Sequence, residues 1–77
     1  MYEELVAEAK ASTYLPASTA RRRAIREEAG ASQARCAREL GVDRATFSRW
    51  EAGHRRPRGE YLVRYVELLR SLQEAVR

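Results

Sequence analysis

The sequence is poor in the residues on which most covalent and metal chemistry depends. Among 77 residues, Cys36 is the single cysteine and His54 the single histidine. One cysteine excludes an intrachain disulfide and a multi-cysteine metal site, and one histidine leaves no ligand set for structural zinc. Catalysis by Cys36 would need a neighbouring base, yet His54 stands in an arginine-rich stretch. We therefore expect no enzyme, no metal and no cofactor, with Cys36 buried as a small residue and His54 solvated or facing phosphate.

Long apolar runs are missing as well. No apolar segment approaches the ~20 residues that a bilayer-spanning helix needs. Glu3 and Glu4 stand where a signal peptide would carry basic residues. We therefore expect a cytoplasmic protein with no membrane partner. A chain of 77 residues can bury one modest core but cannot enclose a deep cavity, so no small-molecule ligand is expected.

Positive charge gathers in the middle of the chain. The net charge is +4, and residues 1–17 contribute one lysine against three glutamates. Residues 18–58 carry eleven arginines against five acidic residues, and residues 59–77 balance three arginines with three glutamates. A basic segment is typical of a surface that meets phosphate, although many solvated faces are also rich in arginine. It indicates nucleic-acid binding only when an element that reads nucleic acid lies inside it.

Hydrophobic spacing and capping residues predict five helices. Apolar residues recur at helical spacing near the N-terminus until residues 12–16 break the pattern, where Pro16 cannot continue a helix. Ser18 or Thr19 can cap the next helix, and Gly30 follows its end, where a left-handed cap is favoured. The predicted helices cover residues 2–11, 19–29, 33–40, 44–52 and 60–76.

Residues 32–53 contain two short helices joined by a tight turn. Ser32 is placed to cap the first helix, which Gly41 ends. Asp43 caps the second helix, which Gly53 ends. Two capped helices around a glycine-containing turn predict a helix-turn-helix, the element that places its second helix in the major groove of DNA. The residues expected in its core are Ala34, Ala37, Leu40, Val42, Phe47 and Trp50.

These residues match a known family over the segment SQARCARELGVDRATFSRWEAGHRRP. The segment resembles the helix-turn-helix of the phage repressor and Cro proteins, often called the XRE-like family. The resemblance covers residues 20–72 and implies an all-α, lambda-repressor-like bundle of four or five helices that binds double-stranded DNA. Its marks are Arg26, Ser32–Gln33, Ala37, Leu40–Gly41–Val42, Trp50–Glu51, Gly53 and Pro57. We expect one domain over residues 1–77, with an N-terminal helix and linker at 1–16, the helix-turn-helix at 32–53 and a C-terminal helix at 59–77.

The exposed face of the helix at residues 44–52 is expected to read DNA bases, because its aromatic residues face inward. The resemblance implies that Arg44, Ala45 and Arg49 meet base edges. The methyl groups of Ala45 and Thr46 can contact thymine, and arginine can donate two parallel hydrogen bonds to guanine. Base contact is therefore favoured over phosphate contact for Arg49, whereas both interpretations stay open for Arg44.

A second set of residues is expected to contact the DNA backbone. Gln33 opens a helix, where free backbone N–H groups and the helix dipole favour a phosphate; the alternative is an ordinary exposed glutamine. The loop after residue 53 carries three arginines, which are well placed for backbone phosphates. The arginine run at 21–23 either flanks the DNA groove that the helix at residues 44–52 enters or is solvated. The expected phosphate contacts are Arg22, Gln33, Ser48, His54, Arg55, Arg56 and Arg58.

Arg26 and Glu51 are expected to be structural. The resemblance implies that they form a partly buried ion pair. This pair would tie the helix at residues 19–29 to the recognition helix, which is the helix at residues 44–52. Arginine suits this place because its planar guanidinium can donate two hydrogen bonds to one carboxylate. Loss of one partner would leave a buried charge unpaired and destabilise the fold.

Three residues depart from the family pattern and predict an underfilled core. Arg22 stands where an aliphatic residue is usual, Ala31 is smaller than the usual leucine, and Cys36 replaces another leucine. We expect the added N-terminal segment to pack against the underfilled side of the core around these three positions. The side chains available for it are Leu5 and Val6, with Leu15 as a further candidate.

The C-terminal helix has more apolar residues than one face can bury. Leu62, Val66 and Leu69 can serve the core. The residues left for a second copy of the chain are Tyr65, Leu68, Leu72 and Val76. A twofold homodimer would place two recognition helices about one DNA turn, ~34 Å, apart. The alternative is that the N-terminal helix covers this face and that the protein stays monomeric.

The function expected from these features is sequence-specific regulation of transcription by a small Cro-like or minimal repressor that occupies an operator. It would act at the nucleoid, or in the host cytoplasm if a phage encodes it. The first alternative is an antitoxin-like module that uses the same fold to bind a protein. The second is a nonspecific architectural DNA binder, against which Arg44 and Arg49 on the reading face argue.

Overall fold

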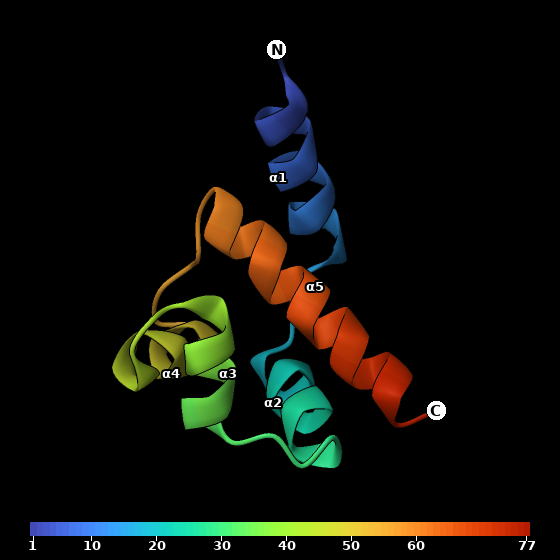
Figure 1. Ribbon diagram of the computed structural model, residues 1–77, viewed down its shortest axis with the longest axis vertical. Helices are drawn as coiled ribbons and strands as arrows, with labels where there is room; N and C mark the ends of the chain where they lie inside the picture. Colours follow the sequence, from blue (N-terminus) through green and yellow to red (C-terminus); the bar gives the residue numbers. More distant parts are fainter.

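Five α-helices form the computed structural model, which describes residues 1–77 (Figure 1). The expected all-α bundle with a helix-turn-helix is confirmed. The helices are α1 (Glu3–Tyr14), α2 (Thr19–Glu28), α3 (Gln33–Leu40), α4 (Arg44–Ala52) and α5 (Glu60–Ala75). α5 lies between α1 on one side and α2, α3 and α4 on the other. None of the five helices combines the length and the apolar character that crossing a membrane requires.

Local capping groups set the ends of the helices. The side chains of Ser18, Ser32 and Asp43 accept hydrogen bonds from backbone N–H groups three residues ahead, at 3.1, 3.0 and 2.6 Å. Each bond satisfies an N–H group that the first helical turn leaves without a partner. Gly41 and Gly53 end α3 and α4 with φ of 75° and 79°, a left-handed conformation that glycine adopts without strain. The predicted bounds of both helices are therefore confirmed.

α1 is longer than its apolar spacing predicts. The break was expected at Ser12, but the helix continues to Tyr14. Leu15 then takes an extended conformation with ψ of 121°, because a following proline disfavours the helical region for the residue before it. Pro16, and not the small polar residues before it, therefore ends α1. The ends of α2 and α5 lie one residue before their predicted bounds, which is the usual variation at helix ends.

Aromatic side chains from α4 and α5 form the centre of the core. Phe47 and Tyr65 lie edge to face with ring centroids 5.6 Å apart, and Trp50 lies 6.0 Å from Tyr65. Of the predicted helix-turn-helix core, Val42 is half-buried and the other residues are buried, except Ala34. Ala34 is exposed because the inward face of α3 is formed by Cys36, Ala37 and Leu40. The prediction that Ala34 lies in the core is therefore wrong. The buried hydrophobic core consists of Ala11, Leu15, Ile25, Cys36, Ala37, Leu40, Phe47, Trp50, Leu62, Tyr65, Val66 and Leu69.

Tyr65 is not accessible to a second chain, so its assignment to a dimer face is wrong. Its side chain is completely buried, because position 65 lies on the same face of α5 as Leu62 and Leu69. The hydroxyl has no hydrogen-bond partner. Burial raises the pKa of Tyr65 to about 12, so the group stays neutral in ordinary buffers.

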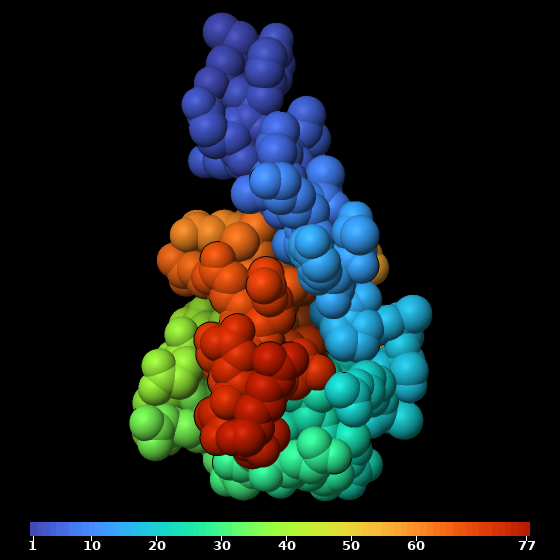
Figure 2. All heavy atoms as spheres, turned by 90° about the vertical axis from the view of Figure 1, so that its right-hand side faces the viewer, coloured from blue at the N-terminus to red at the C-terminus, as the bar shows by residue number.

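The N-terminal helix does not fill the underfilled side of the core. Leu5 and Val6 are 68% and 48% exposed, since the first turns of α1 project beyond the body of the molecule (Figure 2). Ala11 and Leu15, at the other end of this segment, are buried. The expectation for Leu5 and Val6 is therefore wrong, and the part of this segment that enters the core is the last turn of α1 and the residue that follows.

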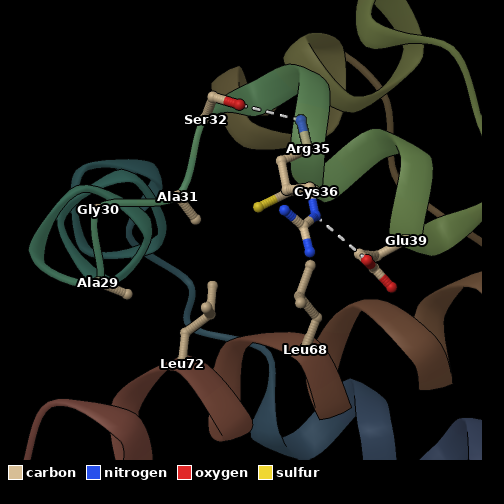
Figure 3. A pocket seen from close by; sticks show the side chains of 9 residues that line it. All are labelled: Ala29, Gly30, Ala31, Ser32, Arg35, Cys36, Glu39, Leu68 and Leu72. Atoms are coloured by element: carbon tan, nitrogen blue, oxygen red, sulfur yellow. Dashed lines mark hydrogen bonds and ion pairs between the residues drawn. The ribbon is translucent and has the colours of Figure 1, made fainter.

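The underfilled side remains open as a hollow of about 600 Å³ between α3 and α5 (Figure 3). Ala31 and Cys36 face Leu68 and Leu72 across this hollow. No residue of α1 lines it. The small residues at positions 31 and 36 thus leave a concave, partly apolar surface on the molecule.

Substitution of Leu15 is expected to destabilise the protein, whereas substitution of Leu5 is not. Leu15→Ala removes a buried side chain and leaves a cavity, which lowers the free energy of unfolding by about 2–5 kcal/mol. Leu5→Ala changes an exposed side chain and is expected to shift this energy by less than about 0.5 kcal/mol. Chemical denaturation followed by circular dichroism measures both, and equal losses would contradict the packing of α1 described above.

Removal of the Tyr65 hydroxyl is expected to leave the stability unchanged or to raise it. Tyr65→Phe eliminates a buried polar group without a partner and keeps the ring contact with Phe47. The expected melting temperature is at or above that of the unaltered protein. Tyr61→Phe, at an exposed position, is the control. A clear decrease confined to Tyr65→Phe would show that the hydroxyl is satisfied in solution.

Candidate nucleic-acid interface

α4 presents an inward aromatic face and an outward face of arginines and small residues. Its two aromatic side chains are buried in the core. Arg44, Ala45 and Arg49 are exposed, and Thr46 and Ser48 are half-buried. At 3.6 residues per turn, these five positions lie on the side of the helix away from the core. The four residues expected to meet base edges are therefore all accessible from outside.

The arginines of α4 and of the loop 54–58 form no ion pairs within the chain. Arg23, Arg35 and Arg64 each pair with a glutamate four residues away on the same helix. By contrast, no arginine of α4 or of the loop 54–58 forms an ion pair. The positive charge on this side of the molecule is therefore available to attract a polyanion.

A basic hollow of about 690 Å³ adjoins the outward face of α4. Thr46 and Arg49 line it from α4, and Trp50, Pro57 and Tyr61 form further parts of its wall. The remaining lining residues are His54, Arg55, Arg56 and Arg58, all of which are exposed. The structure thus places the loop residues expected at phosphates beside the residues expected at bases.

Gln33 at the start of α3 is not an ordinary exposed glutamine. It is half-buried, and its Nε2 donates to Glu51 Oε1 at 3.0 Å. One N–H group of its amide remains for another acceptor. Gln33 and Ser48 line a hollow of about 450 Å³ that Thr19 and Ala20 border from the start of α2. Two helix N-termini meet at this hollow, and both carry a positive dipole end that favours phosphate.

Arg22 is a structural residue, so its assignment to a phosphate contact is wrong. Its side chain is buried; Nε donates to Pro16 O at 2.7 Å and Nη1 donates to Trp50 O at 3.0 Å. Trp50 O lies in the last turn of α4, where the helix dipole is negative and a positive charge is favourable. Arg22 therefore ties the linker between α1 and α2 to the end of α4.

The sequence contains a signal for this role of Arg22. Arg22, Ile25 and Arg26 recur at helical spacing, and all three are buried in α2. A helix face that includes an isoleucine and the arginine of a buried ion pair points inward. The first arginine on that face is thereby also predicted to point inward.

The ion pair expected between Arg26 and Glu51 is present and buried. Arg26 Nε donates to Glu51 Oε2 at 2.6 Å, and Nη2 donates to Oε1 at 2.9 Å. Arg26 Nη1 donates to Ala31 O at 2.8 Å. With the bond from Gln33, which the sequence did not suggest, these contacts join α2, α3 and α4. Two parallel bonds between planar groups also fix the orientation of α4.

The pair keeps both groups charged. Burial alone would raise the pKa of Glu51, but hydrogen bonds from Arg26 and Gln33 and the charge of Arg26 hold it below its usual value of 4.5. The hydrogen bond to Glu51 raises the pKa of Arg26. A carboxyl group whose pKa is lowered by folding stabilises the native state above its unfolded pKa. The contribution of Glu51 is therefore complete above pH 4.5 and is lost as the pH falls through the lower folded value.

Comparison with protein families matches residues 23–74 to the helix-turn-helix family. The matched segment begins within α2 and ends within α5, so it includes the ion pair, α4 and the loop 54–58 and leaves α1 outside. No curated protein and no solved structure matches the chain.

Glu51→Ala is expected to lower the free energy of unfolding by about 3–5 kcal/mol, because Arg26 then stays buried without its carboxylate. Thermal and urea denaturation at neutral pH measure the loss. Glu39→Ala is the matched control, since Glu39 forms an exposed pair with Arg35 that contributes at most about 1 kcal/mol. A Glu51→Ala protein as stable as the control would show that the buried pair does not hold the fold together.

Proposed function

The chain belongs to the phage repressor and Cro-type helix-turn-helix family, and we propose that it is a small repressor that occupies an operator in double-stranded DNA. Its helix-turn-helix is a DNA-binding domain of the transcription-regulator type. The observation that carries the proposal is the outward face of α4. There Arg44 and Arg49 are exposed and form no ion pair with a carboxylate of the chain.

α4 would lie in the major groove, which is wide enough to admit one helix. Arg49 would donate two hydrogen bonds to guanine O6 and N7, and Arg44, at the start of α4, would reach a base or a phosphate. The methyl groups of Ala45 and Thr46 would contact thymine. Because base edges carry the sequence information, these four residues would determine the operator sequence.

Two groups of residues would hold the DNA backbone on either side of α4. One group lies at the hollow between the starts of α2 and α3, and the other lies in the loop that follows α4. Their contacts would set the register and orientation of α4 without specifying bases. The residues are Gln33, Ser48, His54, Arg55, Arg56 and Arg58.

A second copy of the chain would pack on the hollow between α3 and α5. Leu68 and Leu72 are half-buried there, and Val76 beyond them is 48% exposed. α1 leaves this surface uncovered. Twofold pairing buries the same surface on both copies and would place two recognition helices about one DNA turn, ~34 Å, apart. The operator would then be an inverted repeat.

Two rival functions use the same fold. Leu5 and Val6 are exposed on the projecting part of α1, which favours an antitoxin-like module that binds a protein. Unpaired arginines would also serve a nonspecific architectural DNA binder. Arg44 and Arg49 on the accessible face of α4 favour specific readout over both.

Selection of the purified protein against a randomised DNA pool, followed by sequencing, tests the proposal. One enriched motif is expected, as an inverted repeat for a dimer or as a single half-site for a monomer. Binding that falls with salt alike on every duplex, without enrichment, would contradict specific readout and support the architectural role. Absence of DNA binding together with a co-purifying protein would support the interaction module.

On the enriched duplex, Arg49→Ala is expected to relax the preference at one base pair by about 1–3 kcal/mol. Arg55→Ala is expected to weaken binding to all duplexes alike and to lower the slope of log K against log salt by about 1. Arg77→Ala is the control, because the C-terminus lies away from α4 (Figure 1). Titrations at several salt concentrations measure these effects. If Arg49→Ala weakened all sequences equally, Arg49 would be a phosphate contact.

A further inference from the structure

Ser12 and Arg56 connect α1 to the loop that follows the recognition helix. Arg56 Nη2 donates to Ser12 Oγ at 2.6 Å, between residues 44 positions apart in the sequence. Both residues are exposed, and the acceptor is a neutral hydroxyl. A hydrogen bond from a charged donor is stronger than one between neutral groups. The hydroxyl therefore orders the guanidinium and leaves its charge unpaired. A carboxylate in the same place would form an ion pair with it.

The turn of α1 that carries Ser12 is fixed to the bundle. Ala11 and Leu15, which precede and follow it in the chain, are buried in the core. Arg22 is buried as well, and it donates both to Pro16 O and to a carbonyl in the last turn of α4. The end of α1 therefore has a set position relative to the recognition helix, although its first turns project from the molecule.

Arg56 stands between two hollows. On one side it lines the basic hollow together with Thr46 and Arg49. On the other side it lines a hollow of about 390 Å³ together with Ser12 and Glu8. Glu8 lies one helical turn before Ser12, yet it forms no ion pair with Arg56. The positive charge of the arginine is thus unpaired beside the residues expected to read bases.

We propose that α1 belongs to the DNA-binding surface and that Ser12 is the positioning residue of Arg56. The contact holds the guanidinium in one orientation before DNA binds, and its remaining N–H groups donate to a backbone phosphate. Pre-ordering strengthens binding because an arginine otherwise loses much rotamer freedom when it is immobilised at an interface. Ser12 lies outside the segment 23–74 that matches the family. The inference therefore extends the proposed DNA-binding function and rests on it.

Four proteins test the inference on the enriched duplex: the unaltered chain, Ser12→Ala, Arg56→Ala and the double variant. Ser12→Ala is expected to weaken binding about three- to tenfold, the effect of one well-placed hydrogen bond. Arg56→Ala is expected to weaken it more and to lower the salt slope by about 0.9, the value for one phosphate contact. Ser12→Ala added to Arg56→Ala is expected to change neither quantity, because Ser12 acts through Arg56.

Two further variants separate the hydroxyl from the fold of α1. Ser12→Thr keeps the hydroxyl and is expected to keep the affinity. Thr13→Ala is the matched control, since Thr13 Oγ1 donates to Ala9 O within α1 and does not contact the loop; its affinity is expected to be unchanged. Alanine is the best helix former, so both alanine variants are expected to stay folded, which melting curves check.

Unchanged affinity of Ser12→Ala overturns the inference. The inference is also overturned if Ser12→Ala lowers the affinity for DNA equally in the unaltered chain and in Arg56→Ala. Ser12 would then act through the fold of α1 and not through Arg56. In both cases the unaltered chain still binds the enriched duplex, and the proposed function stands. Failure of the unaltered chain to bind any DNA overturns the proposed function and the inference with it.

Discussion

The arrangement of the helix-turn-helix depends on the buried ion pair between Arg26 of α2 and Glu51 of α4. Gln33 of α3 and Ala31 O complete its hydrogen bonds. Taking two charges out of water is unfavourable, and the loss is offset only when their hydrogen-bonding groups are satisfied in good geometry. The pair therefore favours one placement of α4 over others. Arg22, one turn earlier on the same face of α2, supports the C-terminal end of α4 from the linker side.

Features of the fold that depend on neighbouring residues could be predicted from the sequence. The ends of α3 and α4 follow from serine and aspartate caps and from glycines, all of which act within a few residues of their own position. The inward side of α4 follows from the spacing of Phe47 and Trp50, and its accessible side from the residues between them. The contact between Arg26 and Glu51 spans 25 residues and was predictable only through the family resemblance.

Features that depend on contacts between distant segments could not be predicted in this way. Leu5 and Val6 have the spacing of a buried helix face, but they are exposed because the first turns of α1 project beyond the body of the molecule. Tyr65 and Leu68 lie less than one turn apart on α5, but aromatic rings of α4 enclose Tyr65, whereas Leu68 faces the hollow beside α3. The bond between Ser12 and the loop 54–58 joins two segments that no local pattern connects.

The packing of α1 on α5 also bears on the order in which the protein assembles and opens. Contacts among α2, α3 and α4 join segments close in sequence, whereas docking of α1 closes a loop that contains most of the chain. Among the helices α1 touches α5 alone, so it can detach at a lower free energy than global unfolding requires. Ser12 leaves with α1 whenever this happens, and Arg56 is then free to move while α4 keeps its place. The affinity for DNA would thus depend on the equilibrium between packed and detached α1, although this helix lies remote from the bases.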